Sequence, residues 1–340
     1  MSDDRPIIAL VPGDPTGIGP ELTARLLHDG RLAQVARLVL VGDARVMRRG
    51  ARFAGVPLEL APVDRPAEAR FDGPGVPIVD LGNIDPDALP LGEASAEAGR
   101  LTGDTLARAI DFAQAGEVDA ISFAPLNKGA MFRGGWEFPD EHKMFAHLLN
   151  HEGPFSEMNV LDGQWMTRVT SHVSLREAVE QITGPNICRA LQLAHDTMQR
   201  AGIAHPRIAV AALNPHNGEG GLFGREEIDI IRPAVEEMAA KGIDCSGPYP
   251  SDTVYLKAFR GEFDSVTAMY HDQGQIATKL KGFNKGVTVT AGLATVFTTP
   301  AHGTAYDIVG KGSADPGAFE TAVRLAAQLA TRARELAGAA

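Results

Sequence analysis

The stretch PIIALVPGDPTGIGPEL, residues 6–22, changes character twice. An apolar run long enough for a buried strand leads into a turn that contains Gly13, Gly17 and Gly19, and the turn leads into an amphipathic segment. A strand that passes through a short turn into a helix is the repeating unit of α/β proteins with parallel sheets. The turn offers backbone N–H groups and a helix N-terminus, which suit an anion or a cofactor, although a plain tight connection would use the same residues. It lacks the GxGxxG pattern of dinucleotide-binding turns.

The alternation of short apolar runs and longer amphipathic runs continues along the chain. The predicted strands are 6–13, 37–43, 76–82, 119–125, 166–172, 207–215, 265–271 and 286–292. The predicted helices lie near 19–28, 94–115, 174–201, 226–241 and 317–337. Pro233 should kink or interrupt the fourth of these helices. This order predicts an α/β fold with mostly parallel sheets. A length of 340 residues suffices for two domains, which can share the chain discontinuously.

Composition excludes several classes of protein. A net charge of −11 argues against a protein that binds nucleic acid. The two cysteines, Cys188 and Cys245, form no CxxC motif, so neither a disulfide framework nor a cysteine zinc site is expected. No apolar run approaches the roughly 20 residues that span a bilayer, and the short run after the acidic N-terminus is too short for a signal peptide. We therefore expect a cytoplasmic protein that does not associate with membranes.

Three histidines follow three of the predicted strands. His172 ends MTRVTSH, His216 lies in NPHNGEGG after RIAVAALNP, and His271 ends SVTAMYH. Because the carboxyl ends of parallel strands meet at one edge of a sheet, these side chains can converge. Three imidazoles suit a first-row divalent ion, with Asp252 or Asp272 as carboxylate ligands. Each histidine alone would also be explained as a hydrogen-bonded loop residue, and Asp252 as a helix or turn cap.

A second glycine-rich segment, PAHGTAYDIVGKGSADP, occupies residues 300–316. It contains His302, Asp307 and Lys311, but composition alone assigns it no role.

Taken together, six motifs resemble those of the 4-hydroxythreonine-4-phosphate dehydrogenase family. They are PGDPTGIGPEL, APLNKG, NPHNGEGG, SDT, MYHDQG and HGTAYDIVGKG, and they extend from residue 8 to about residue 320. The first and last also resemble motifs of isocitrate and isopropylmalate dehydrogenases. The resemblance implies two α/β/α domains with a cleft between them, a homodimer, a divalent ion, and NAD or NADP. We expect a cofactor-side domain of residues 1–125 and 288–340, and a metal, substrate and dimerisation domain of residues 126–287.

The resemblance also assigns roles to individual residues. His172, His216 and His271 match the family's metal ligands, and Asp252 and Asp272 match acidic residues beside a metal site to which both subunits contribute. Lys279 and His142 match substrate-binding residues, and Lys279, Asp272 and Asp252 are the candidate catalytic residues. The cofactor-binding candidates are Gly13, Gly17, Gly19, His302, Gly303, Thr304 and Asp307.

Three positions depart from the family pattern. Lys143 replaces a threonine, Thr288 replaces an asparagine that contacts substrate, and Phe297 replaces an arginine that contacts substrate. Arginine suits a phosphate or a carboxylate because it bonds in a bidentate manner, and phenylalanine cannot do so. Lys143 is a candidate replacement cation. Phe297 would suit a substrate with an apolar ring, but an ordinary core residue is an equal alternative.

The expected function is metal- and NAD(P)-dependent oxidation of a secondary alcohol β to a carboxylate, with decarboxylation of the keto acid. The resemblance implies a phosphorylated hydroxy acid as substrate and a place in pyridoxine biosynthesis. The alternatives are the same chemistry on an unphosphorylated aromatic cis-dihydrodiol carboxylate of the terephthalate type, a three-histidine zinc hydrolase, and a ligand-binding protein without activity. Three histidines favour zinc, while magnesium, manganese and cobalt remain alternatives.

Overall fold

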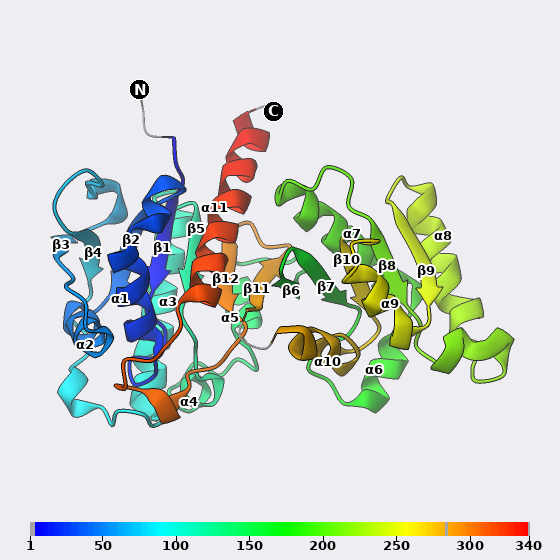
Figure 1. Cartoon of the computed structure of the whole chain (residues 1–340), viewed down its shortest axis with the longest axis horizontal. Coiled ribbons are helices and arrows are strands. Elements are labelled where there is room, and N and C mark those ends of the chain that lie inside the picture. Colours follow the sequence, from blue (N-terminus) through cyan, green and yellow to red (C-terminus); the bar gives the residue numbers. More distant parts are fainter. Residues whose placement is uncertain (1–3, 283–284, 339–340) are drawn as a thin grey trace. The chain divides into compact units, whose positions relative to one another are not determined.

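The computed structural model describes residues 4–282 and 285–338. The chain divides into two compact units, Met1–Glu152 with Leu293–Ala340, and Gly153–Gly292 (Figure 1). Each unit is an α/β structure, as the alternation of apolar and amphipathic runs predicts. No helix in the described part of the chain is both long enough and apolar enough to span a bilayer.

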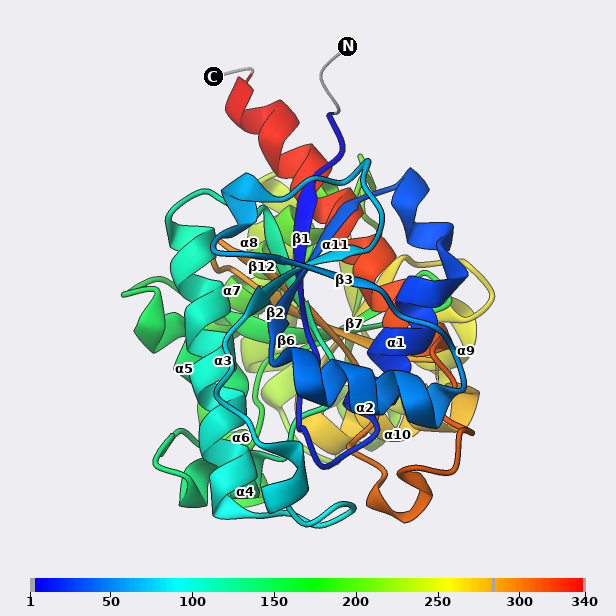
Figure 2. The same cartoon turned by 90° about the vertical axis from the view of Figure 1, so that its left-hand side faces the viewer.

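The first unit is built on a parallel sheet with the strand order β3-β4-β2-β1-β5-β12. Its strands are β1 (Ile7–Val11), β2 (Arg37–Gly42), β3 (Leu60–Val63), β4 (Val76–Asp80), β5 (Ala120–Phe123) and β12 (Val296–Pro300). Its helices are α1 (Gly19–Asp29), α2 (Ala44–Ala54), α3 (Ala96–Gln114), α4 (Lys128–Arg133), α5 (Glu141–Leu148) and α11 (Gly317–Gly338). In Figure 2, α3 lies on one side of these strands, and α1 and α11 lie on the other.

Local sequence signals explain where these helices begin and end. Asp43 caps α2 by accepting a hydrogen bond from the backbone N–H of Arg45, and Ser95 caps α3 in the same way. Pro20 lies in the first turn of α1, where its missing N–H costs nothing, and Gly30 ends that helix with a left-handed φ of 65°. Residues 8–11 of the central strand β1 are fully buried, which accounts for their continuous apolar run.

The second unit has the strand order β11-β6-β7-β10-β8-β9. Its strands are β6 (Ser156–Leu161), β7 (Gln164–Arg168), β8 (Ile208–Ala211), β9 (Cys245–Tyr249), β10 (Ser265–Ala268) and β11 (Val287–Ala291). The pairs β11–β6 and β6–β7 are antiparallel, whereas β7–β10, β10–β8 and β8–β9 are parallel. Its helices are α6 (Leu175–Gln181), α7 (Gly184–Arg200), α8 (Arg232–Ala240), α9 (Ser251–Ala258) and α10 (His271–Gly282).

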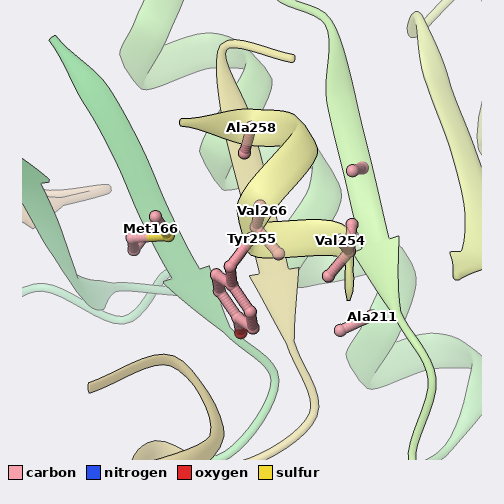
Figure 3. Packing of buried hydrophobic residues seen from close by; sticks show 7 residues of the cluster. Met166, Ala211, Val254, Tyr255, Ala258 and Val266 are labelled. Atoms are coloured by element: carbon pink, nitrogen blue, oxygen red, sulfur yellow. The ribbon is translucent and has the colours of Figure 1, made fainter. Parts of the chain in front are cut away.

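Helix α9 packs on the parallel half of this sheet. Figure 3 shows the buried cluster that it makes with β7, β8 and β10: Met166, Ala209, Ala211, Val254, Tyr255, Ala258 and Val266. A π-helical turn, Glu227–Ile231, precedes α8, and Pro233 lies in the first turn of that helix. Where Pro233 was predicted to kink or interrupt a helix, the hydrogen bonding changes from π to α, while the backbone of Ile231 and Arg232 stays right-handed helical. Proline in the first turn of α8 removes no hydrogen bond that this helix needs.

The two units share the chain discontinuously, but their boundaries differ from those expected. Residues 126–152 belong to the first unit because they include α4 and α5, which pack on α3. Residues 288–292 belong to the second unit because β11 pairs with β6. The predicted limits near residues 125 and 287 are corrected to Glu152 and Gly292.

Candidate functional site

The strands that precede the three candidate metal ligands are neighbours. Strand β10 pairs in parallel with β7 on one side and with β8 on the other, so the carboxyl ends of all three lie at the same edge. His172 follows β7, His216 follows β8, and His271 is the first residue of α10, which is separated from the end of β10 by two residues. The rings of His172 and His271 lie side by side, with centroids 5.4 Å apart.

His172 and His271 line one pocket of about 230 Å³ in the second unit. The other lining residues are Thr170, Ser171, Val173, Leu175, Ala178, Tyr270 and Asp272. Asp272 Oδ1 lies 2.7 Å from His271 Nδ1, which leaves Nε2 as the nitrogen available to a metal. The Ser171 hydroxyl is buried and has no hydrogen-bond partner in the described part of the chain. The pocket therefore offers two imidazoles to a divalent ion, and two protein ligands alone do not complete a metal site.

His216 is held differently. Its ring lies 6.3 Å from that of Phe223, between ring centroids. Within residues 4–282 and 285–338, no three histidine, cysteine, aspartate or glutamate side chains are grouped closely enough to hold a metal. The structure therefore brings together two of the three candidate histidines. Asp252 lies in the first turn of α9, but Pro250 occupies the N-cap position and no side chain caps the helix, so the alternative role of Asp252 as a cap is not supported.

The backbone explains the position of His216. Five consecutive residues of Pro215–Gly221 have positive φ: His216 (52°), Asn217 (58°), Gly218 (71°), Glu219 (44°) and Gly220 (67°). This left-handed run directs the side chains away from where a right-handed turn would place them. The fully buried carboxylate of Glu227 fixes the backbone just before this run. It accepts hydrogen bonds from the backbone N–H groups of Leu213 (2.9 Å) and Asn214 (2.6 Å).

Two further candidates lie in the second unit. Lys279 lies on α10, eight residues after His271, and Gln275 lies midway between them. Residues four apart lie on the same side of a helix, so all three side chains are on one side of α10. Thr288 on β11 is buried, and its hydroxyl accepts a hydrogen bond of 3.0 Å from Asn159 Nδ2.

The remaining substrate candidates lie in the first unit. His142 on α5 is buried and Lys143 beside it is exposed. Phe297 on β12 is fully buried and stacks on Phe145, with ring centroids 4.1 Å apart and an angle of 12° between the rings. Phe145 in turn meets the ring of Phe123 edge to face. These contacts favour the alternative in which Phe297 is an ordinary core residue.

The two glycine-rich segments at opposite ends of the chain come together in the first unit. The backbone N–H of Ile18 donates to the carbonyl of Thr304 at 3.1 Å, and the Tyr306 hydroxyl donates to Asp14 Oδ2 at 2.5 Å. A Cβ atom on Gly17 would lie 3.0 Å from Thr304 Cβ, so glycine permits this approach.

Two other glycines of the first turn are also sterically required. Gly13 has a φ of 71°, and a Cβ atom there would lie 2.5 Å from the carbonyl oxygen of Ala124. A Cβ atom on Gly19 would lie 2.1 Å from the carbonyl oxygen of Pro12. Close packing of the backbone therefore explains both glycines without a ligand.

The start of α1 is a poorer site for the phosphates of a cofactor than the loop that follows β12. Glu21, buried in the first turn of α1, accepts a hydrogen bond from the Ala314 N–H at 3.1 Å. A phosphate at that helix start would meet its negative charge. The loop that follows β12 is more open, because Gly303 and Asp307 are exposed and a Cβ atom on Gly303 would meet nothing within 4 Å. Burial, and then the hydrogen bond to Asp14, raises the pKa of Tyr306 to about 12, so its hydroxyl stays a donor.

Sequence reasoning missed several polar residues around these candidates. They are Asp14, Glu157, Asn159, Arg168, Gln275 and Tyr306. Asp14 and Tyr306 lie inside the two glycine-rich motifs and could have been singled out there. The polar residues of β6 and β7 give no local signal, because their partners lie on neighbouring strands and on α10.

Comparison with known proteins gives consistent similarities. Residues 34–326 match the family model described as "Pyridoxal phosphate biosynthetic protein PdxA". The D-threonate 4-phosphate dehydrogenase of Cupriavidus necator is 44% identical over 334 residues, which cover 98% of this chain and 99% of that protein. The crystal structure of 4-hydroxythreonine-4-phosphate dehydrogenase from Klebsiella pneumoniae is 40% identical, with a TM-score of 0.85, and the match covers 97% of this chain and 100% of that one.

A solved structure with the alternative activity is less similar. The terephthalate 1,2-cis-dihydrodiol dehydrogenase of Burkholderia xenovorans is 31% identical, with a TM-score of 0.66, and the match covers 95% of this chain and 98% of that one. All of these relatives are dehydrogenases, and the chain is accordingly an oxidoreductase that acts on CH–OH groups. The match over most of its length shows that the chain belongs to the family of the pyridoxal phosphate biosynthetic protein PdxA.

Proposed function

We propose that this protein is a metal- and NAD(P)-dependent dehydrogenase that oxidises a secondary alcohol of a phosphorylated hydroxy acid. The observation that carries this proposal is the similarity, over nearly the whole chain, to dehydrogenases named for 4-hydroxythreonine 4-phosphate and D-threonate 4-phosphate. The hydroxyl lies β to the carboxylate, so its oxidation yields a β-keto acid that can lose CO₂. A zinc hydrolase would leave this similarity unexplained.

The metal would be held by His172 and His271, with His216 and a carboxylate completing the set. The paired imidazoles at one pocket support this assignment, and the contact of Asp272 with His271 Nδ1 would fix the ring for ligation through Nε2. A bound divalent ion supplies Lewis acidity, which lowers the pKa of the substrate hydroxyl. Imidazole donors favour zinc, and the same donors also accept manganese or cobalt, whereas magnesium prefers oxygen ligands.

The remaining roles fall to side chains of this chain. Because Asp272 already contacts His271, we assign removal of the hydroxyl proton to Lys279, on the same side of α10, with Asp252 and Asp272 orienting the site. His142 would hold the substrate. The loop with His302, Gly303, Thr304 and Asp307 would contact the nicotinamide cofactor, which accepts the hydride. Gly13, Gly17 and Gly19 would support that loop through close backbone packing.

A homodimer is part of the proposal. Most of the large apolar side chains that are exposed in the described part of the chain belong to the second unit, and two of them, Val173 and Leu175, line the candidate metal pocket. Those of the second unit are Val173, Leu175, Val179, Leu222, Phe223, Leu256, Ile276 and Leu280. Leu280 is 84% exposed and Leu222 is 74% exposed. Apolar side chains exposed to this degree are typical of surfaces that a partner covers, and a second copy of the chain would cover them.

An unphosphorylated aromatic dihydrodiol is the weaker substrate candidate. Its support in the sequence was Phe297, but that side chain is fully buried against Phe145. The named dihydrodiol dehydrogenase is also less similar than the two phosphate-specific relatives.

The test is reduction of NAD or NADP, followed by absorbance, with D-threonate 4-phosphate, 4-hydroxythreonine 4-phosphate and a terephthalate-type dihydrodiol in parallel. The variant His271→Ala should lose bound metal and at least about 100-fold in kcat, while its circular dichroism is unchanged. The matched control is His205→Ala, because His205 is an exposed loop histidine of the same unit. Full activity in the His271 variant, or turnover of the dihydrodiol alone, would overturn the proposal.

A further inference from the structure

One face of the antiparallel half of the second unit carries polar side chains on three adjacent strands. Thr288 of β11 stands opposite Asn159 of β6, and Asn159 stands opposite Met166 of β7. Because side chains alternate between faces, Glu157 and Arg168, two residues away from Asn159 and Met166, point to the same side of the sheet. A face that should be apolar in a core therefore holds a row of groups that need hydrogen-bond partners.

These residues form a connected network. Asn159 Oδ1 accepts hydrogen bonds from Arg168 Nη2 (2.5 Å) and from Gln275 Nε2 of α10 (2.9 Å). Asn159 Nδ2 donates to Thr288 Oγ1 (3.0 Å) and to Glu157 Oε1 (3.2 Å). Arg168 Nη2 also lies 3.1 Å from Glu157 Oε1. The network is thus organised around the guanidinium of Arg168 and the amide of Asn159.

The network leaves one strong donor unused. Arg168 is only 5% exposed, and its Nη1 is buried without a hydrogen-bond partner among residues 4–282 and 285–338. A buried guanidinium nitrogen without a partner is costly, and native structures rarely keep one unless a ligand or an ordered water satisfies it. The Tyr255 hydroxyl is also buried without a partner in the described part of the chain. Burial raises the pKa of this hydroxyl, and the positive charge of Arg168 opposes that rise.

The position of this donor relates it to the candidate site. Glu157 Oε2 lies 3.8 Å from His172 Nε2, so the network begins beside the paired histidines. Thr288, at its other end, occupies the position of a substrate-contacting asparagine in the family pattern. Gln275, which bonds to the network, lies one helical turn from both His271 and Lys279 on α10. Lys279 is therefore a second cation, besides Arg168, on the side of the helix that carries Gln275.

We propose that Arg168 binds the phosphate group of the substrate through Nη1 and supplies a cation, which Phe297 cannot do. Asn159 and Glu157 hold the guanidinium in place by occupying Nη2, and Thr288 and Lys279 flank the bound oxyanion. Arginine is suited to this role because its planar, permanently charged group binds phosphate oxygens in a fixed direction. Lys143, the other candidate for the missing cation, is an exposed residue of the first unit. This inference rests on the proposed function, because it names the subsite for that substrate's phosphate.

The test measures two quantities in the full-length protein with its metal bound. The first is the dissociation constant of inorganic phosphate by calorimetry. The second is the ratio of KM values for D-threonate and D-threonate 4-phosphate. The variant Arg168→Lys keeps the charge beside Glu157 but loses the second arm of the guanidinium. The double variant Arg168→Gln with Glu157→Gln keeps the buried pair neutral, so that no carboxylate is left unpaired if the single variant folds poorly.

We expect Arg168→Lys to weaken phosphate binding and to raise KM for the phosphorylated substrate by about tenfold or more, with a much smaller change in KM for D-threonate. The matched control is Arg207→Lys. Arg207 pairs with Asp264 at the start of β8, at the opposite end of the strands, and its replacement should change neither quantity. The double variant should show the same loss of phosphate affinity as the single variant.

Three outcomes would count against the inference. Phosphate affinity unchanged in both variants would show that Nη1 is satisfied by an internal water and that Arg168 is structural. Equal increases in KM for both substrates would assign the arginine to the carboxylate instead. Turnover of the phosphorylated substrate with KM unaffected by Arg168→Lys would refute the subsite and leave the proposed function intact. Conversely, phosphate binding that depends on Arg168 without turnover of any phosphorylated substrate would support the subsite and refute the proposed function.

Discussion

Replacement of Phe297 separates two explanations of the position where the family pattern has an arginine. The structure buries this side chain completely and stacks it on Phe145 at 4.1 Å. Truncation of a buried phenylalanine costs about 3–5 kcal/mol, and loss of a stacked aromatic pair adds about 0.5–1.5 kcal/mol. We therefore expect Phe297→Ala to lower the free energy of unfolding by about 5 kcal/mol, and the thermal midpoint of the first unit by roughly 10–20 °C.

The assay is urea and thermal unfolding followed by circular dichroism, with KM measured on the folded fraction. The matched control is Phe132→Ala, because Phe132 of α4 is 50% exposed in the same unit and should change stability by no more than about 0.5 kcal/mol. Phe297→Arg, which restores the family residue, should not fold stably, because it places a charge at a fully buried position that packs against Phe145. The reasoning fails if Phe297→Ala retains wild-type stability while KM changes tenfold, or if Phe297→Arg folds and gains phosphate affinity.

Two further predictions concern the glycine-rich segments of the first unit. Gly19→Ala should destabilise the unit by about 1–3 kcal/mol, because its Cβ atom would lie 2.1 Å from the Pro12 carbonyl oxygen, and unchanged urea unfolding would contradict that packing. Burial and the hydrogen bond to Asp14 raise the pKa of Tyr306 to about 12, above the ordinary value of 10. The folded state therefore keeps the proton while the unfolded chain loses it, so the free energy of unfolding should fall between pH 10 and pH 12. Tyr306→Phe should weaken that fall in urea titrations, and an identical pH dependence in the variant would be the opposite result.

The sequence predicts well those elements whose burial produces a simple pattern. All eight expected strands occur, because parallel strands such as β1 and β8 are buried on both faces and appear as continuous apolar runs. Strand β6 was missed because Glu157 and Asn159 interrupt its apolar residues, and β9 because it contains Gly247 and Pro248. Helix α10 was missed because its first residue, His271, was assigned to the end of the preceding strand, and no element was assigned to the residues that follow it.

The candidate site likewise has features that the sequence could predict and features that it could not. The placement of His172 and His271 at the carboxyl ends of strands could be predicted, because parallel strands end at one edge of a sheet, whereas the direct pairing of β7 with β10 could not. The position of His216 could not, because it depends on a backbone conformation that the residue types alone do not require. The network around Arg168 could not either, because its hydrogen bonds join β6, β7, β11 and α10, and their register is a tertiary property.

The left-handed run after β8 has a consequence for which mutations the chain can accept. Glycine adopts positive φ at little cost, and asparagine does so more readily than most residues, whereas β-branched residues are strongly disfavoured there. His216, Asn217 and Glu219 have side chains at positions of positive φ, where glycine would have the lower conformational energy. Random substitution of this segment should therefore be tolerated in a narrow order, with glycine and asparagine first and valine and isoleucine last. Glycine at Asn217 should make the second unit more resistant to heat, so a side chain retained there despite that gain indicates selection for something other than folding.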